Sequence, residues 1–325
     1  MAKSRSGVAS ALRLALIVII SVIILCGVAS CGLVLWLAFD DGPANASGDS
    51  AGNGGDSHAP VYLMMVRDTR HDQSSDVGRT DSMALVRVLD RKSIDIVQLP
   101  RDLLVDIPAC KLPSGKTTEP EKTKLNAAYA YGASEEAVDI PSLFGLRCSK
   151  ETIEKHTGVD IAGSVVMDLE TIGEVVDGLG DVELCVTADQ AAGFAGVQEG
   201  CQIISGDTAV AFSQTRVGVQ DNSDLSRLER QRAVVQAIAK RLGSFSVGDI
   251  PSLMKLVSDL GPRMVTDQRL FTGGNARRIV GTLKSGELNS QVMPVNPAGD
   301  GANLVPAPGA DALWEALKTD KPLPN

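Results

Sequence analysis

The stretch Asp68–Asp102, with the sequence DTRHDQSSDVGRTDSMALVRVLDRKSIDIVQLPRD, decides the fold of this chain. Apolar runs at 61–66, 83–89 and 94–99 predict three β-strands. The polar link 90–93 has the length of a hairpin turn, so the second and third strands are predicted to pair antiparallel. If the preceding loop likewise folds the first strand back onto the second, the charged residues between the strands meet at one edge of one sheet.

Three pairs of arginine and aspartate are expected at this edge: Asp68 and Arg70, Arg79 and Asp81, and Arg101 and Asp102. A single pair of this kind on a protein surface is usually only a salt bridge. Three converging pairs favour a functional site, because arginine forks suit the recognition of phosphate and paired carboxylates supply oxygen ligands for Mg²⁺.

An apolar run at 14–39 contains no charged residue and is long enough to span a bilayer. Basic residues precede this run within 1–13, and two aspartates follow it, so the N-terminus is predicted to stay in the cytoplasm. The pattern predicts a transmembrane signal anchor in the cell membrane, with the catalytic part on the extracytoplasmic side. A lipoprotein processing site at Cys31 is the alternative, but the apolar run continues through Leu37, which favours the uncleaved anchor.

The segment 40–60 is rich in Gly, Ser, Asn, Ala and Asp and is predicted to be a flexible linker. It leads to an extracytoplasmic domain at 61–325, which ends in a C-terminal capping segment. The net charge of −9 gives no general electrostatic reason to bind nucleic acid. An arginine cluster within such an acidic chain suits a small anionic ligand better than a polyanion.

The cysteines outside the apolar run are Cys110, Cys148, Cys185 and Cys201. An even number of cysteines in an oxidising compartment predicts disulfides. Three connectivities are possible, and the pairs Cys110–Cys148 and Cys185–Cys201 are favoured because each closes a modest loop between neighbouring segments. The cysteines lack the CxxC spacing typical of metal sites.

A second charged stretch lies far along the chain. An apolar stripe at helical spacing over 228–242 predicts a helix that begins near Asp224. Asp224, Arg227 and Gln231 lie on one face of this helix. A cation in the first turn opposes the helix dipole, so Arg227 is favourable only if it meets an anion. Asp224 could be that anion, but the nearby Arg216 favours a bound ligand.

The remaining pattern is that of strands alternating with helices. A strand at 161–167, a helix at 169–177 and a strand at 182–186 are predicted to add to the first sheet, giving a mixed sheet covered by helices. Lys124 is expected at the start of a helix, and a last amphipathic helix at 311–317 is expected to cap the domain.

Five short motifs follow the apolar run in order: DTR at 68, GRTDS at 78, PRD at 100, KLNAAY at 124 and DLSRLERQ at 224. In this order the chain resembles the LytR-CpsA-Psr family over 61–242. The resemblance implies an α/β fold, an α-β-α sandwich around a mixed twisted sheet, preceded by one transmembrane helix. It also implies a long hydrophobic cleft for a polyprenyl chain, and an enzyme that transfers a glycopolymer from a polyprenyl-pyrophosphate carrier to peptidoglycan.

Carried over residue by residue, the resemblance implies two aspartates that bind Mg²⁺, namely Asp68 and Asp81. The arginines expected to hold the pyrophosphate are Arg79, Arg101, Arg216 and Arg227, with Gln231 beside them, Lys124 at the edge, and Arg70 in the DTR motif. Asp102 and Asp224 are expected to orient arginines.

Two departures from the family pattern are visible. Gln214 stands where the family commonly has an arginine, and Val66 stands where a glycine often precedes the DTR motif. Gln214 makes a non-enzymatic envelope protein that binds or regulates lipid-linked glycans one alternative. A polyprenyl-pyrophosphate hydrolase is the other, because it needs the same residues and differs only in the acceptor. The sequence does not identify the glycopolymer.

Overall fold

The computed structural model describes residues 58–68, 78–136, 141–215, 224–266, 273–299 and 302–324. The predicted anchor at 14–39 and most of the predicted linker lie outside these residues. Within the described part of the chain, no helix is long and apolar enough to cross a membrane.

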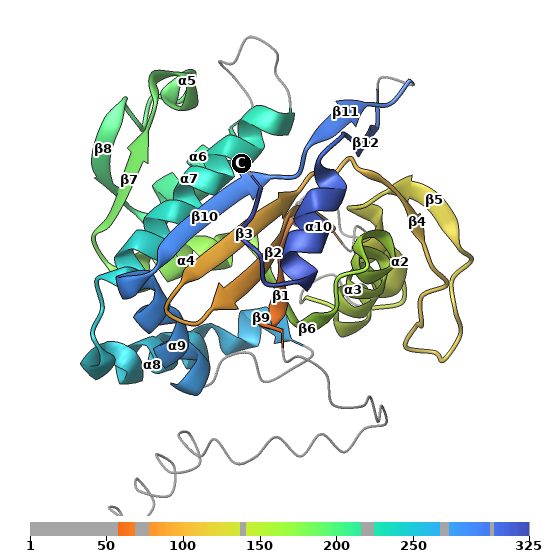
Figure 1. Cartoon of the computed structure of the whole chain (residues 1–325), viewed down its shortest axis with the longest axis horizontal. Coiled ribbons are helices and arrows are strands. Elements are labelled where there is room, and N and C mark those ends of the chain that lie inside the picture. The colour runs from red at the N-terminus through yellow and green to blue at the C-terminus, as the bar shows by residue number, and fades with distance from the viewer. Residues whose placement is uncertain are drawn as a thin grey trace, which may run out of the picture. The chain divides into compact units, whose positions relative to one another are not determined.

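A six-stranded sheet, in the order β10-β3-β2-β1-β6-β9, forms the centre of the fold (Figure 1). Its strands are β1 (Val61–Asp68), β2 (Arg79–Leu89), β3 (Ser93–Leu99), β6 (Ile161–Asp168), β9 (Met264–Thr266) and β10 (Glu287–Val292). β2 pairs antiparallel with both β1 and β3, whereas β6 and β10 run parallel to their neighbours β1 and β3. The sheet is therefore mixed, as predicted.

Helices cover both faces of this sheet, which gives the three-layer arrangement (Figure 1). One face carries α2 (Ala127–Ala133), α3 (Leu143–Thr157) and α10 (Ala310–Lys318). The other carries α4 (Leu169–Leu179), α6 (Gly206–Gln214), α7 (Asp224–Gly243), α8 (Ile250–Leu260) and α9 (Gly273–Ser285). The smaller elements are α5 (Ala188–Ala191), β4 (Leu104–Ile107), β5 (Glu121–Lys124), β7 (Val182–Val186), β8 (Gly200–Ile204), β11 (Val295–Pro297) and β12 (Leu304–Pro306).

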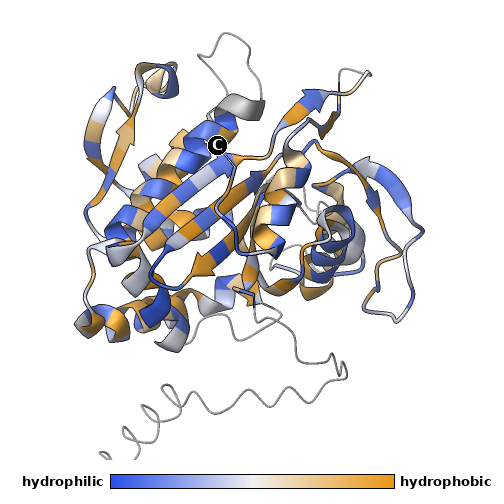
Figure 2. Cartoon of the chain, in the orientation of Figure 1, coloured by the Kyte–Doolittle hydropathy of each residue, from blue (hydrophilic) through white to orange (hydrophobic). Residues whose placement is uncertain are grey.

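Side chains of successive strand residues point to opposite faces of the sheet, and this alternation builds two different environments. Leu63, Met83 and Leu85 belong to the buried core shared with α2, α3 and α10. Their neighbours Ala84 and Val86 instead line a cavity on the α7 and α9 side. Bands of hydrophobic and hydrophilic residues along the strands make the alternation visible (Figure 2).

The prediction that the strand at 182–186 joins the main sheet is wrong. This strand, β7, pairs with β8 in a separate two-stranded sheet. Cys185 and Cys201 are direct partners in that pairing and form a disulfide. The inward residues Val182 and Leu184 pack into a second core with α6 and α7, so burial of β7 does not require the main sheet.

Two further features differ from what the sequence predicts: the position of Lys124 and the presence of strand β10. Lys124 ends strand β5, and α2 begins only at Ala127. Helix α3 begins at Leu143, where Ser142 caps it by accepting a hydrogen bond from the Gly145 N–H. Strand β10 was not predicted, because its sequence ELNSQV lacks an apolar alternation.

Both favoured disulfide pairings are present in the structure. Cys110–Cys148 is buried and has a Cα–Cα distance of 5.3 Å. Cys185–Cys201 is exposed and has a Cα–Cα distance of 4.0 Å. The first ties the segment after β4 to α3, and the second closes the β7–β8 hairpin.

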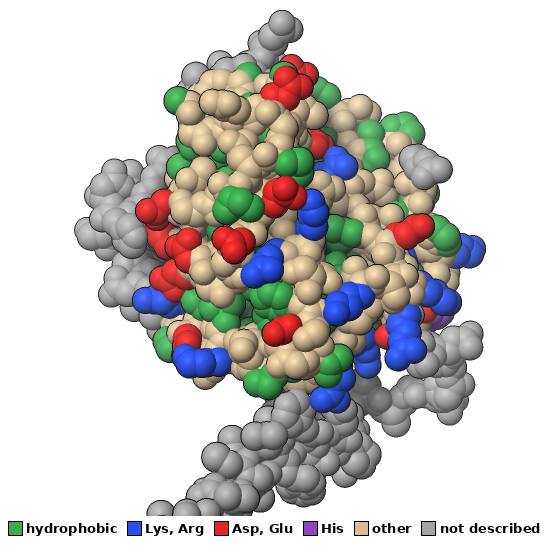
Figure 3. All heavy atoms as spheres, turned by 90° about the vertical axis from the view of Figure 1, so that its left-hand side faces the viewer, with side chains coloured by type: hydrophobic (Ala, Val, Ile, Leu, Met, Phe, Trp, Pro, Cys, Tyr) green, Lys and Arg blue, Asp and Glu red, His purple; other side chains and the backbone are tan. Residues whose placement is uncertain are grey.

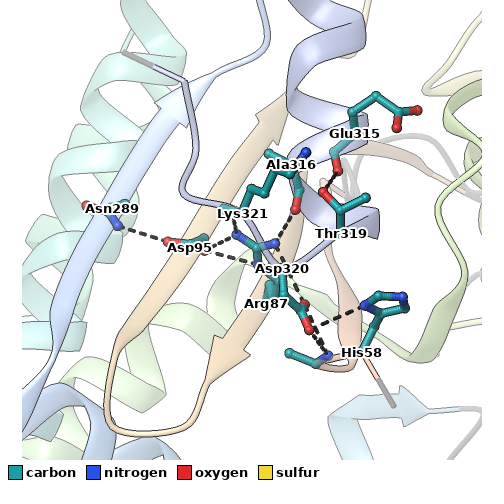
Figure 4. Close-up of polar contacts among 10 residues, drawn as sticks. His58, Arg87, Asp95, Asn289, Glu315, Ala316, Thr319, Asp320 and Lys321 are labelled. Atoms are coloured by element: carbon teal, nitrogen blue, oxygen red, sulfur yellow. Dashed lines mark hydrogen bonds and ion pairs between the residues drawn. The ribbon is translucent and has the colours of Figure 1, made fainter. Parts of the chain in front are cut away.

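A buried ion pair fastens the C-terminal segment to the sheet (Figure 4). Arg87 and Asp95 face each other across β2 and β3, both side chains have 0% exposure, and Nη2 of Arg87 lies 2.6 Å from Oδ2 of Asp95. The same guanidinium donates to the carbonyl oxygens of Ala316 and Lys321, while Asn289 donates to the other oxygen of Asp95 at 2.9 Å. Strand β10 and the residues after α10 are thus held by one charged pair.

Candidate functional site

The charged site lies at the edge of the sheet where β1 ends, β2 begins and β3 ends. Met83 pairs with Leu99 across β2 and β3, so Asp81 and Arg101, each two residues beyond that pair, lie side by side. The first turn of α7 reaches the same edge and brings Arg227 to Asp81, 146 residues away in sequence. The two charged stretches of the sequence therefore meet here.

Asp81 joins two arginines. Its Oδ1 accepts a hydrogen bond from Nη1 of Arg101 at 2.8 Å, and its Oδ2 accepts one from Nη1 of Arg227 at 3.1 Å. Nη2 of Arg227 also lies 3.4 Å from the backbone oxygen of Asp81. The Arg227 side chain is only 3% exposed, against 17% for Asp81. Two guanidinium groups thus converge on one anionic position that solvent still reaches.

This geometry explains the cation in the first turn of α7. The positive end of a helix dipole disfavours an arginine there unless an anion lies close. Asp81 supplies such an anion from β2. The side chain of Asp224, the other candidate partner, lies outside the described residues.

A second charged pair flanks the first. Asp102 accepts a hydrogen bond from Nζ of Lys124 at 2.7 Å, and its other oxygen lies 3.7 Å from Nε of Arg101. Asp102 thus lies between the two cations. Lys124 is held at the edge of the site although it lies on strand β5 and not at a helix start.

Gln231 lies one turn after Arg227 on α7. Its side chain is buried, and its Oε1 has no hydrogen-bond partner among the described residues. An unsatisfied buried amide is costly, and at this cavity wall a polar group of a ligand would satisfy it. The amide can present either its oxygen or its N–H groups to such a ligand.

Two cavities meet at this site. The smaller, of about 110 Å³, is polar at one end, where it is lined by Asp81, Ser82, Ser213, Gln214, Arg227 and Gln231. The larger, of about 310 Å³, is mostly apolar and runs between the sheet and helices α7 and α9. Both share the residues Val66, Ser82, Ile172, Val235 and Ile238 as walls. The charged pocket therefore continues into an apolar one.

The structure places the other predicted residues as follows. Arg79 is exposed at the start of β2. In the backbone register of β1 and β2 it lies opposite Asp68, at the end of β1. The backbones of Asp68 and Asp224 are described, but their side chains are not. Arg70 and Arg216 lie outside the described residues.

Two buried arginines outside the predicted set of site residues support the site. Arg67, next to Asp68, is 1% exposed and binds both carboxylate oxygens of Asp168, at 2.6 Å and 3.0 Å. Burial opposes its charge, but the hydrogen bond to Asp168 and the nearby charges raise the pKa of Arg67 above its ordinary value. An arginine inside the apolar strand VYLMMVRD was the available sequence signal.

The second is Arg230, which is buried on α7 between Arg227 and Gln231. It donates to the carbonyl oxygens of Gln190, Ala192 and Thr215, at 2.8, 2.5 and 2.7 Å. Thr215 directly follows α6. Arg230 therefore holds the C-terminal end of α6 in place, and Gln214 at that end lines the polar cavity.

Asp81 is the described carboxylate of the site that could hold a magnesium ion. Mg²⁺ prefers carboxylate oxygens, and a carboxylate offers about four lone-pair sites. Each oxygen of Asp81 accepts one hydrogen bond from an arginine, and each has a further lone pair. The strand register places Asp68 opposite Arg79, two residues from Asp81.

Comparison with solved structures shows the same fold. A protein from Streptococcus agalactiae, gbs0355, superimposes with a TM-score of 0.62 at 21% identity, covering 82% of this chain and 90% of that one. A structure described as "TagT bound to LIIa-WTA" gives a TM-score of 0.59, also at 21% identity, covering 82% of this chain and 93% of that one.

Curated proteins with similar sequences are named as teichoic acid transferases. The Bacillus mycoides (strain KBAB4) protein "Polyisoprenyl-teichoic acid--peptidoglycan teichoic acid transferase TagU" is 30% identical over 189 residues, which cover 58% of this chain and 54% of the relative. TagU of Enterococcus faecalis is 30% identical over 200 residues, covering 61% and 58%. The chain thus spans little more than half the length of these relatives.

One family model covers the site and both cavities. The model of the LytR_cpsA_psr family matches residues 46–319, which include every described residue of the charged site and of the cavity walls. This chain belongs to the LytR-CpsA-Psr family.

Proposed function

We propose that this protein transfers a glycopolymer from a polyprenyl-pyrophosphate carrier to peptidoglycan during cell wall assembly. The carrying observation is that the charged pocket around Asp81, Arg101 and Arg227 continues into an apolar cavity. Such a combination fits an amphiphile with an anionic head and a long hydrocarbon chain, because each part of the ligand meets its matching surface.

The names of the relatives support the choice of donor and acceptor. TagU proteins are named as teichoic acid transferases that join a polyisoprenyl-linked polymer to peptidoglycan. A teichoic acid is therefore the first polymer to test with this chain, and arabinogalactan and capsular polysaccharide are the next.

In the proposed reaction, an acceptor hydroxyl of peptidoglycan attacks the phosphorus that bears the glycan. The bond from this phosphorus to the bridging oxygen breaks, and polyprenyl phosphate leaves with that oxygen. The proton released by the hydroxyl passes through solvent to the leaving phosphate. Arg101 and Arg227 stabilise the negative charge that develops on the phosphate oxygens. Arg79 and Lys124 contribute to this stabilisation from the edge of the site. Gln231 supplies a neutral hydrogen bond to the same group.

We further propose that Mg²⁺ is the cofactor, held by Asp68 and Asp81. The ion supplies charge neutralisation to the pyrophosphate. Neighbouring side chains hold in place the residues that contact the substrate and the ion. Asp102 orients Arg101, and Arg67 with Asp168 fixes the end of β1 that carries Asp68.

The predicted anchor at 14–39 completes the proposal. It would hold the domain at the extracytoplasmic face of the cell membrane, where a polyprenyl-linked substrate resides. The linker at 40–60 would keep the domain close to that surface.

The test uses the full chain in lipid vesicles with a polyprenyl-pyrophosphate-linked teichoic acid and purified peptidoglycan. We expect polymer to become covalently attached to peptidoglycan, and we expect chelation of Mg²⁺ to stop this attachment. Release of polyprenyl phosphate at the same rate without peptidoglycan would instead identify a hydrolase. Tight donor binding with no turnover under any metal would identify a non-enzymatic binding protein.

Replacing Arg227 by lysine will lower the transfer rate by about tenfold to a hundredfold, because lysine keeps the charge but loses the planar fork that spans Asp81 and a phosphate. Arg232 provides the matched control, since it lies on the same helix and forms only a half-exposed pair with Glu229. We expect Arg232→Lys to transfer polymer at the wild-type rate. Equal rates for both variants would remove Arg227 from the proposed site.

A further inference from the structure

The apolar cavity has a second end, opposite the charged site. It follows β2 and β3 away from Asp81 to Val88 and Ile94, where Leu283 of α9 and Leu288 of β10 complete its wall. Arg278 of α9 also lines the cavity and is exposed, so the cavity reaches the molecular surface near this end.

Exposed cations surround this end. Arg91 and Lys92 form the β2–β3 turn, and this turn is packed against the end of α9. The Arg91 N–H donates to Oγ1 of Thr282 at 3.0 Å, and the Glu287 N–H donates to the Lys92 carbonyl at 2.9 Å. Lys284 follows on α9.

We call this group the basic rim; its members, all exposed, are Arg91, Lys92, Arg277, Arg278 and Lys284. The carboxylates beside it are Asp90, Glu287 and Asp249. Hydrogen bonds from Ser246 lower the pKa of Asp249 below its usual value, and Lys284 contributes to this shift. Among the described residues of this region, cations outnumber carboxylates, although the whole protein has a net charge of −9. Basic side chains also gather at the lower right of the surface view (Figure 3).

The chain enters the domain at the same end of the sheet. Val61 pairs with Arg87, two residues before Leu89, where the β2–β3 turn begins. The Ala59 N–H is held by Asp320, whose carboxylate also lies 3.9 Å from Arg87 (Figure 4). The residues that precede this entry point are the linker and the predicted anchor, and the linker as a coil spans about 25 Å.

We propose that the basic rim is the membrane-facing surface of the domain and that it binds the headgroups of anionic phospholipids. Such headgroups attract basic clusters that lie within a Debye length of the bilayer. This orientation turns the second end of the apolar cavity to the lipid, so that a hydrocarbon chain can enter it from the bilayer. The proposal rests on the proposed anchoring, but it does not depend on the transfer reaction.

The test uses the full chain with a specific protease site inserted in the linker at 42–57. The protein is placed in vesicles of phosphatidylcholine alone, or with about one third phosphatidylglycerol to give the surface a negative potential. After cleavage, the share of the domain that floats with the vesicles is measured. We expect about tenfold more retention on the anionic vesicles, and its loss at about 1 M salt, where the Debye length is short.

Charge reversal locates the contact. The triple variant R91E/K92E/K284E is expected to lose this retention, whereas the control K111E/K116E/K122E, with the same change in net charge, is expected to keep it. Thermal unfolding of both variants shows that they are folded. Equal retention on neutral and anionic vesicles, or equal loss in both triples, would overturn the proposal. This experiment does not measure transfer activity. A negative result therefore overturns the membrane-facing surface and leaves the proposed transfer reaction untouched.

Discussion

Asp81→Asn will lower the rate of glycopolymer transfer by about a thousandfold, on the scale seen when one strong electrostatic contact is removed from an active site. Asp81 is the residue on which the site converges, because each of its carboxylate oxygens accepts a hydrogen bond from a different arginine. An asparagine of the same shape keeps one acceptor but turns an N–H₂ group towards the other guanidinium. It also removes the charge proposed to bind Mg²⁺.

The measurement compares transfer by the full chain in vesicles at saturating donor. The matched control is Asp106→Asn, because Asp106 is an exposed aspartate on β4. We expect this control to keep the wild-type rate and both variants to unfold at similar temperatures. An Asp81→Asn protein that is folded and retains more than about a tenth of the rate would contradict the central role of Asp81.

Arg87→Met will lower the free energy of unfolding by about 4 kcal/mol, because it leaves the Asp95 carboxylate charged, buried and without its cation. Both side chains of the pair have 0% exposure. The change also removes the donors to the carbonyl groups of Ala316 and Lys321 (Figure 4). Urea titration at one pH measures the loss.

The double variant Arg87→Met with Asp95→Leu separates the two causes. Replacing both charges removes the unpaired carboxylate, so we expect most of the lost stability to return. The lost carbonyl contacts should keep the double variant somewhat below the wild type. If single and double variants are equally destabilised, the loss comes from packing and not from the buried charge.

The strands next to the site were predictable because their signals are local. The polar link 90–93 is short, and the apolar runs beside it alternate in the structure between the core and the cavity. Helix α7 was predictable from its apolar stripe. Strand β10 was not, because Glu287–Val292 is polar and is held in the sheet by its parallel pairing with β3, which comes far earlier in the chain.

The sequence predicted Asp81, Arg101 and Arg227 for one site, and the structure brings these three together through contacts that the sequence could not specify. The helix dipole required an anion near Arg227, yet it could not distinguish Asp224 from a ligand or from a residue of another strand. The structure supplies Asp81 as a partner through a contact between residues 146 apart. Arg67 and Arg230 were missed because their partners are a distant aspartate and three backbone carbonyls, which leave no motif in the sequence.

The most direct measurement of the proposed reaction follows one phosphorus atom. The donor is prepared with ³²P only in the phosphate that bears the glycan, and the full chain is given this donor and peptidoglycan. Attack at that phosphorus predicts that the label becomes covalently bound to peptidoglycan while unlabelled polyprenyl phosphate is released in equal amount. Label that remains on the lipid as polyprenyl pyrophosphate, with unlabelled glycan on peptidoglycan, would show attack at the sugar carbon and would contradict the proposed phosphoryl transfer.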